Sequence, residues 1–340
     1  MTDRTLDDLD ALIDGLGIAS DHDLVREILA TGVALGRDGT DRLDLKITAS
    51  AMAEMRAAFA MFEPFRDRSK VTIFGSARTA DHDPLYAQTH DVAERLAAEG
   101  WMVVTGAGPG IMQAAMEGAG QEASIGVSIR LPFETRANDV IHDDPKHVSM
   151  KYFFTRKLML VKESQGFVAV PGGFGTLDET LELLTLQQTG KAEPTPIVLL
   201  DVPGGTYWRQ FERFVTDELA ARGLVATDDM ERVLITDSAQ AAVDEILGFW
   251  RNYDSIRWVG KRLVVRLRHE PTDAEVASLN ERFASSLAEG AIERTGPLPA
   301  ERSGGDRLEL PRLAMVWQQR AVGDLHRLIR ACNALDSAAR

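Results

Sequence analysis

The sequence of 340 residues contains a single cysteine, Cys332, and few aromatic residues. One cysteine excludes an internal disulfide and any metal site built from several cysteines, and it is typical of a reducing compartment. Long apolar runs are also missing, because the longest are far shorter than the roughly 20 residues that cross a membrane. The N-terminus is acidic and has no apolar signal core. These absences predict a cytoplasmic protein with no membrane partner.

Several catalytic and cofactor motifs are absent as well. No serine lies in a G-x-S-x-G elbow, which excludes the common acyl-serine hydrolase chemistry. The seven histidines form no H-E-x-x-H or other ligand spacing, so no metal is predicted. Neither the dinucleotide fingerprint G-x-G-x-x-G nor a P-loop occurs. The sequence therefore favours a mononucleotide over NAD or ATP hydrolysis and predicts no cofactor.

The net charge of −14 argues against nucleic acid as a partner, because Lys and Arg drive nonspecific binding to phosphates. The charge is unevenly distributed: residues 1–65 hold 13 acidic and 6 basic side chains, whereas residues 251–340 hold 12 and 15. The C-terminal segment is therefore a candidate site for an anionic effector. An arginine-rich, solvated surface explains the same composition.

Between residues 70 and 250, short apolar runs alternate with helical segments. That alternation predicts an α/β fold, a Rossmann-like doubly wound parallel sheet with helices on both faces. In such sheets ligands bind at the carboxyl ends of the strands. The predicted strands are Val71–Phe74, Met102–Thr105, Ile125–Ile129, Phe167–Val170, Pro196–Leu200 and Val233–Thr236.

The two ends of the chain differ from this centre. We predict a helical N-terminal extension over 1–66, a Rossmann-like domain over 67–250 and a small α+β appendage over 251–340. The extension has the pattern of two or three acidic amphipathic helices. In the appendage, the patterns predict a strand over 261–268, a helix over 272–287, a polar loop over 297–306 and a final helix over 313–334.

The most informative segment is 170–179, where an apolar run leads into Pro-Gly-Gly-Phe-Gly and then a helix. Glycines let the backbone approach a ligand closely, and the N–H groups and positive dipole end of the helix suit a phosphate. Thr176 adds a hydroxyl and Glu179 a carboxylate. A carboxylate repels phosphate, so Glu179 is expected to act on a neighbouring group. The alternative is a helix-capping box made by Thr176 and Glu179.

Residues 171–179, Pro-Gly-Gly-Phe-Gly-Thr-Leu-Asp-Glu, resemble the PGGxGTxxE motif of the Lonely Guy (LOG) family. Its members are phosphoribohydrolases that cleave nucleoside 5′-monophosphates such as AMP and cytokinin riboside monophosphates, and they have often been labelled lysine decarboxylases. The resemblance spans roughly residues 70–250. Its other parts follow in order: Phe74-Gly-Ser-Ala-Arg78, Thr105-Gly-Ala-Gly-Pro-Gly-Ile-Met112, Leu131-Pro-Phe-Glu134, Arg156-Lys157 and Thr185.

The resemblance implies hydrolysis of AMP or N6-modified AMP to a free base and ribose 5-phosphate, in a catalytic domain over 67–250. An oxocarbenium-like transition state requires a nearby carboxylate, and the resemblance implies Glu179 for that role, with Arg156 as the second catalytic residue. The family commonly has Met-His-x before Arg-Lys, whereas this chain has Phe-Phe-Thr at 153–155, which changes the pocket wall. The implied substrate-binding residues are Ser76, Gly108, Gly110, Glu134, Lys157, Gly172, Gly173, Phe174, Gly175, Thr176, Leu177, Asp178 and Thr185.

Without the family, several of these residues have plainer explanations. Arg156 and Lys157 would be a basic surface pair, Glu134 an exposed loop acid and Thr185 a half-buried helix residue. Asp178 would be a charge that stabilises a helix start.

Other functions use the same features. A non-enzymatic nucleotide sensor or carrier would keep the glycine turns but would not need both Arg156 and Glu179. A pyridoxal-phosphate lysine decarboxylase would need a reactive lysine, and Lys157 is the only candidate near the predicted site. The resemblance also implies a homodimer or a larger homo-oligomer, because the family's site is usually completed near a subunit interface.

Overall fold

A computed structural model describes residues 3–131, 136–318 and 322–339. The chain divides into two compact units, Met1–Phe59 and Ala60–Arg340. The first unit contains α1 (Asp3–Gly15), α2 (His22–Arg37) and most of α3 (Arg42–Phe62), so its predicted helical character is confirmed. An ion pair of 3.0 Å between Arg26 and Asp10 joins α2 to α1.

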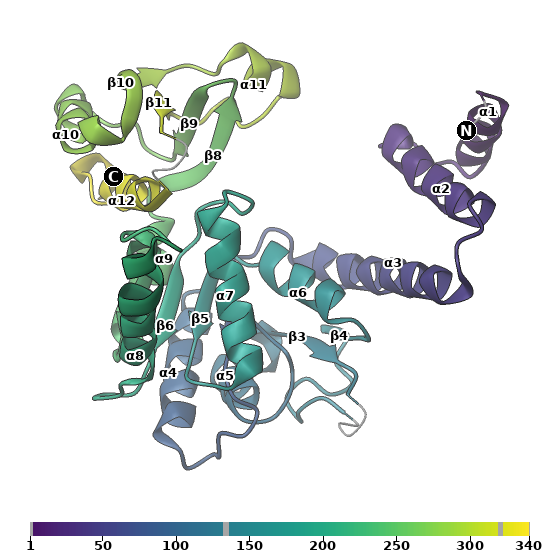
Figure 1. Ribbon diagram of the computed structural model, residues 1–340, viewed down its shortest axis with the longest axis horizontal. Helices are drawn as coiled ribbons and strands as arrows, with labels where there is room; N and C mark the ends of the chain where they lie inside the picture. Colours follow the sequence, from purple (N-terminus) through teal and green to yellow (C-terminus); the bar gives the residue numbers. More distant parts are fainter. Residues whose placement is uncertain (1–2, 132–135, 319–321, 340) are drawn as a thin grey trace. The chain divides into compact units, whose positions relative to one another are not determined.

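The second unit is built on a seven-stranded sheet in which every neighbouring pair of strands is parallel (Figure 1). Several of its strands are buried at every position, as expected for parallel strands covered on both faces. In spatial order the strands are β4 (His147–Met150), β3 (Ser124–Ile129), β2 (Met102–Thr105), β1 (Lys70–Phe74), β5 (Gly166–Ala169), β6 (Ile197–Leu200) and β7 (Val233–Thr236). The strand order reverses direction between β1 and β5, and the predicted Rossmann-like fold is confirmed.

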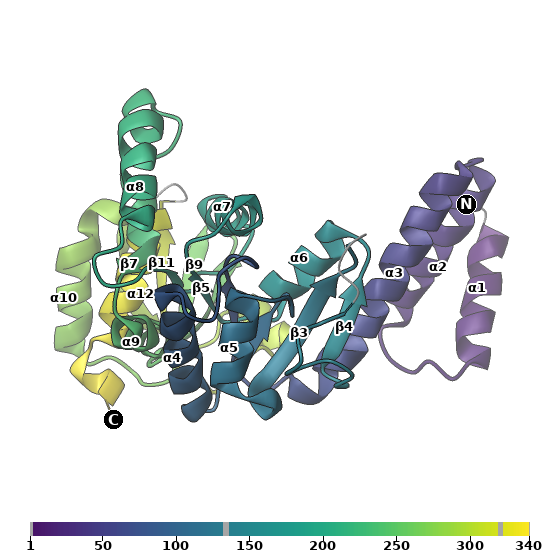
Figure 2. The ribbon, with the colours of Figure 1, turned by 90° about the horizontal axis from the view of Figure 1, so that it is seen from below.

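Helices cover both faces of this sheet. Figure 2 shows α4, α5 and α9 along one face and α6 and α7 along the other. On the first face, apolar side chains of all three helices form one core with β1, β2, β5 and β6. The helices are α4 (Pro84–Ala98), α5 (Ile111–Ala119), α6 (Phe153–Lys162), α7 (Phe174–Gln188), α8 (Tyr207–Phe214) and α9 (Ala239–Phe249).

A separate antiparallel sheet follows at the C-terminus, in the order β10-β11-β9-β8. Together with α10 and α12 it encloses a second apolar core, to which Phe249 at the end of α9 also contributes. Its elements are β8 (Tyr253–Val259), β9 (Arg262–Leu267), α10 (Asp273–Phe283), β10 (Leu287–Thr295), α11 (Pro299–Gly304), β11 (Arg312–Trp317) and α12 (Val322–Asn333).

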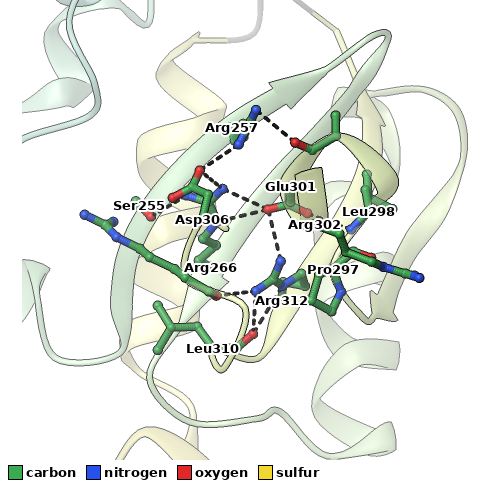
Figure 3. Close-up of polar contacts among 12 residues, drawn as sticks. Ser255, Arg257, Arg266, Pro297, Leu298, Glu301, Arg302, Asp306, Leu310 and Arg312 are labelled. Carbon is green, nitrogen blue, oxygen red and sulfur yellow. Dashed lines mark hydrogen bonds and ion pairs between the residues drawn. The ribbon is translucent and has the colours of Figure 1, made fainter. Parts of the chain in front are cut away.

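A buried ionic network ties α11 to this small sheet (Figure 3). The carboxylate of Glu301 accepts a hydrogen bond of 2.8 Å from Arg266 and lies 3.1 Å from Nη1 of Arg312. Asp306 pairs with Arg266 at 2.7 Å and with Arg257 at 2.8 Å. Removing one partner of a buried ion pair is strongly destabilising. The network therefore fixes the segment that follows β10 in one position.

Two details of the predicted appendage are wrong. Residues 297–306 were expected to be a loop but contain α11, because Glu301 binds the N–H of Leu298 at 2.9 Å as well as the two arginines. The final helix was expected to begin at residue 313, but 312–317 form β11 and α12 begins at Val322. The helix was expected there because a fully buried strand and a buried helix segment share the same continuous apolar pattern.

Among the residues that the structure describes, no helix is both long enough and apolar enough to cross a membrane.

Candidate functional site

A cavity of about 1090 Å³ lies at the carboxyl ends of the central strands, beside the point where the strand order reverses. Doubly wound sheets bind their ligands at this position. Three turns form its floor: 75–78 after β1, 106–108 after β2 and 172–175 after β5. The three glycine turns predicted from the sequence thus meet in one place.

The start of α7 forms one wall of this cavity. Gly173 is the residue before the helix, and no side chain caps the first backbone N–H groups. A Cβ atom at Gly172 would lie 2.2 Å from Oγ1 of Thr176, so only glycine fits there without a shift. The hydroxyl of Tyr207 donates to the carbonyl of Gly172 at 2.7 Å and anchors the turn. An uncapped helix N-terminus facing a cavity suits an anion.

The capping-box alternative for Thr176 and Glu179 is wrong. In a capping box, the two residues are the N-cap and the third helical residue. Here the helix begins at Phe174, so Thr176 already lies inside its first turn and Glu179 lies one turn deeper. The carboxylate of Glu179 is therefore not needed to cap the start of the helix.

The start of α5 forms the second turn of the floor. The N–H of Ile111 donates to the carbonyl of Ser76 at 3.0 Å, which ties α5 to the loop after β1. Gly110 has a positive φ of 67°, and a Cβ atom there would lie 2.5 Å from the same carbonyl. Gly110 is thus required by the close approach of these two turns, and it lies behind the cavity wall instead of lining it.

Arg156 and Glu179 face each other across the cavity floor. Nη1 of Arg156 lies 3.9 Å from Oε1 of Glu179, and both side chains are largely buried. Nε of Arg156 donates to the carbonyl of Val127 on β3 at 3.0 Å, which fixes the guanidinium. Gly106 makes room for it, because a Cβ atom there would lie 2.1 Å from Nη2.

The carboxyl group of Glu179 is buried, and one of its oxygens accepts no hydrogen bond from the described residues. Burial raises the pKa of its carboxyl group to about 7, although the positive charges of Arg156 and Lys157 act in the opposite direction. Among the described residues, its Oε2 has no hydrogen-bond partner. Titratable groups with such shifted pKa values, placed in a cavity, are typical of functional sites.

Lys157 lies beside this pair but is itself engaged. Its ammonium group contacts the carboxylates of Asp178 at 2.8 Å and Glu182 at 2.7 Å. Burial alone would lower the pKa of Lys157, but these two contacts outweigh it and raise the pKa. A lysine that forms a Schiff base must lose its proton, so this environment argues against the decarboxylase alternative.

The structure brings most of the predicted site residues to the cavity, but not all of them. Lys157 and Thr185 are not among its lining residues, and the exposed Thr185 hydroxyl bonds back to Leu181 in its own helix. Glu134 lies outside the described residues. The lining residues from the prediction are Ser76, Gly108, Arg156, Gly172, Gly173, Phe174, Gly175, Thr176, Leu177, Asp178 and Glu179.

Sequence reasoning missed part of the opposite wall. His147 and Ser128 line the cavity and are joined by a hydrogen bond of 2.9 Å between Nε2 and Oγ. Burial lowers the pKa of His147, which favours the neutral ring. His147 lies on β4, an edge strand that the alternation did not predict, so the sequence did not indicate its position at the cavity.

Within the described ranges 3–131, 136–318 and 322–339, no three His, Cys, Asp or Glu side chains are grouped so as to hold a metal ion.

The fold and cavity together define a Rossmann-like α/β protein in which an open helix start lies next to a buried carboxylate. Residues 110–246 match the family model described as "Possible lysine decarboxylase". Over 172 residues, 49% of this chain, the sequence is 29% identical to the cytokinin riboside 5′-monophosphate phosphoribohydrolase of Mycobacterium marinum, and the match covers 88% of that protein. It is 27% identical, with the same coverage, to the Mycobacterium tuberculosis protein of that name. The predicted resemblance is confirmed: the central part of the chain is similar to these phosphoribohydrolases.

Solved structures give a weaker likeness. The molybdenum cofactor carrier protein of Chlamydomonas reinhardtii is 25% identical, with a TM-score of 0.38. The match covers 53% of this chain and 98% of that protein. A likeness of this size does not bear on activity.

Proposed function

We propose that this protein is a hydrolase that cleaves the N-glycosidic bond of nucleoside 5′-monophosphates, AMP or N6-modified AMP, to a free base and ribose 5-phosphate. The observation that carries the proposal is the environment of Glu179. Its carboxylate is buried, lies 3.9 Å from Arg156 and keeps one oxygen without a partner among the described residues. The names of the curated relatives state the same type of reaction.

In the proposed complex, the 5′-phosphate binds the backbone N–H groups at the start of α7, with the hydroxyl of Thr176 beside it. Glu179 lies three residues further along the same helix, one turn deeper in the cavity. The ribose attached to the phosphate is therefore held next to the carboxylate. In this way the phosphate serves to position the sugar for reaction.

The ionised carboxylate of Glu179 stabilises the positive charge that develops on the ribose in an oxocarbenium-like transition state. The bond between C1′ and the base breaks, and its electron pair leaves with the base. A water molecule adds its oxygen to C1′ and gives a proton to Glu179, which passes it to solvent, and the departing base takes up one proton from solvent. Arg156 holds the carboxylate in place and favours its ionised form.

Incubation of the purified protein with a panel of nucleosides and nucleoside monophosphates, followed by chromatography of the free bases, tests this proposal. Adenine is expected to be released from AMP in the presence of a chelator, and adenosine is expected to react much more slowly. Tight AMP binding without release of base would instead identify a non-enzymatic carrier or sensor. Equal turnover of adenosine and AMP would contradict the assigned phosphate site.

The proposal includes a homodimer or larger homo-oligomer in the cytoplasm. Phe153, Phe154 and Leu158 of α6 and Leu181 of α7 are apolar side chains that are 45–55% exposed, and Phe153 also lines the cavity, which supports a subunit contact on these helices. The sole cysteine, Cys332, is a buried free thiol, which suits a reducing compartment. A strictly monomeric and fully active species in light scattering would contradict the oligomer.

A further inference from the structure

A second cavity, of about 550 Å³, lies within the unit Ala60–Arg340. The C-terminal end of α7 and the following segment 189–194 form one side, and side chains of β8, β11 and α12 form the other. It shares no lining residue with the first cavity. Its volume lies in the range of small-molecule sites.

Two buried side chains in this cavity have unsatisfied polar atoms. His326 on α12 is fully buried, and neither of its ring nitrogens has a hydrogen-bond partner among the described residues. Gln187 on α7 is 3% exposed, and its Oε1 lacks a partner within the same set of residues, while its Nε2 donates to the carbonyl of Thr195 at 2.8 Å. Buried polar atoms are nearly always hydrogen-bonded, so exceptions that share a cavity indicate a missing partner.

These atoms define what that partner must offer. Burial, together with the positive charges of Arg330 and Arg232, lowers the pKa of His326 to about 3. The ring is therefore neutral near pH 7, so one nitrogen donates and the other accepts. Gln187 adds a second acceptor. A matching ligand must present both donors and acceptors.

The charges of the lining do not favour a strong anion. Arg257 is engaged by Asp306 at 2.8 Å, and Lys191 is exposed to solvent. Seven described arginines of the C-terminal segment, including Arg257, bind carboxylates within it. The anionic effector expected from composition stays a prediction, but this cavity suits an uncharged ligand better.

Two indole side chains supply flat apolar surface. Trp258 on β8 is 40% exposed and Trp317 on β11 is 3% exposed, and both line the cavity. Aromatic side chains stack on bases of any sequence, and carboxamides form hydrogen bonds with base edges. Indole, imidazole and carboxamide groups together match a planar ligand with polar edges.

We propose that this second cavity binds an uncharged planar heterocycle with donors and acceptors along its edge, the chemistry of a nucleobase, free or in a nucleoside. His326 and Gln187 bind its edge, and Trp258 and Trp317 contact its faces. The site is physically linked to the first cavity, because Gln187 and Glu179 lie on one helix, about 12 Å apart at 1.5 Å per residue. The binding claim does not depend on the proposed hydrolase activity.

Titration of the full-length protein with adenine and with adenosine, followed by tryptophan fluorescence, tests the proposal. A saturable change is expected in wild type and in Arg156→Ala, which alters only the first cavity. His326→Phe keeps a ring of similar size but removes both nitrogens, and it should weaken binding at least ~10-fold. Its melting temperature should be unchanged or higher, because a buried unpaired polar group is removed. Gln187→Met is the second variant and should also weaken binding.

Four results would overturn the proposal. The first is the absence of a saturable signal in wild type with either ligand. The second is undiminished affinity in Gln187→Met together with undiminished affinity in His326→Phe; if the latter variant does not fold, Gln187→Met decides alone. The third is loss of the signal in Arg156→Ala, which would place the ligand in the first cavity. The fourth is binding of inorganic pyrophosphate in place of adenine that is weakened in His326→Phe but not in Arg156→Ala, which would identify the second cavity as an anion site.

Discussion

The guanidinium of Arg156 contacts both the central sheet and helix α7, whose start forms one wall of the cavity. Its Nε donates to the carbonyl of Val127 on β3 at 3.0 Å, and its Nη1 lies 3.9 Å from the carboxylate of Glu179 on α7. A distance of 3.9 Å is an ion pair without a short hydrogen bond. The carboxylate is therefore held in place and partly stabilised, while its second oxygen stays available to a substrate.

Substitution Arg156→Ala is expected to lower kcat/KM for AMP by at least ~100-fold, about 2.7 kcal/mol of transition-state stabilisation. The fold should persist, because the guanidinium faces a cavity instead of the apolar core. Arg213→Ala, an exposed change on α8, is the matched control and should leave both activity and melting temperature unchanged. Near-normal kinetics of Arg156→Ala would contradict a catalytic role for Arg156.

Substitution Gly106→Ala should displace the same guanidinium without removing it. The new Cβ would lie 2.1 Å from Nη2 of Arg156, the far end of a flexible side chain that can move away. We expect kcat/KM to fall by roughly 10- to 100-fold with little loss of stability, since small misplacements of catalytic groups are costly. Gly248→Ala on α9, where a Cβ atom meets nothing within 4 Å, is the control. Equal activity of the two variants would argue against the position assigned to Arg156.

The pH dependence of kcat/KM should reflect the carboxyl group of Glu179. Its pKa is raised to about 7 by burial, and the mechanism requires the ionised form. The rate constant should therefore fall about tenfold per pH unit as pH decreases below about 7. In Glu179→Gln, the residual kcat/KM should not fall in this way below pH 7, because glutamine does not titrate. A wild-type profile that stays flat between pH 5.5 and 8, measured by initial rates of adenine release, would contradict this assignment.

The same raised pKa has a consequence for stability. In the unfolded chain Glu179 ionises near its ordinary pKa of 4.5, whereas in the folded protein it holds its proton until about pH 7. Raising the pH from 4.5 to 7 therefore removes stability, by up to about 3 kcal/mol above pH 7. Glu179→Gln does not titrate, so its unfolding free energy minus that of wild type should increase across this range. Urea unfolding of both proteins at pH 5 and pH 7.5 measures the difference, and a constant difference would refute the buried, raised pKa.

Much of the central sheet could be predicted from the sequence because its strands are short, fully apolar and separated by helical patterns. The predicted Met102–Thr105 and Val233–Thr236 have the bounds of β2 and β7. The edge strand β4 was missed, because the polar residues His147, which is partly buried, and Ser149, which is exposed, interrupt its apolar pattern. β8 and β10 were missed for a similar reason, since their side chains are only partly buried.

The candidate site could be predicted where the demand for glycine is local, as at Gly172, where a Cβ atom would meet Thr176 four residues later. The contacts that each side chain makes in the folded protein could not be predicted from the sequence. The proximity of Arg156 and Glu179 depends on how α6 and α7 pack on the sheet, and the pairing of Lys157 with Asp178 and Glu182 depends on it as well. The second cavity lies between elements more than 60 residues apart in sequence, and no local pattern indicates it.

The central claim is that Glu179 is the catalytic carboxylate, and Glu179→Gln tests it most directly. AMP affinity by calorimetry and adenine release are measured on one preparation of the variant. Glutamine keeps the size of the side chain but cannot carry the negative charge that the transition state requires. We predict AMP affinity equal to or tighter than that of wild type, because a repulsion toward phosphate is removed, and turnover reduced by ~10²-fold or more. Wild-type turnover in this variant would contradict the proposed mechanism.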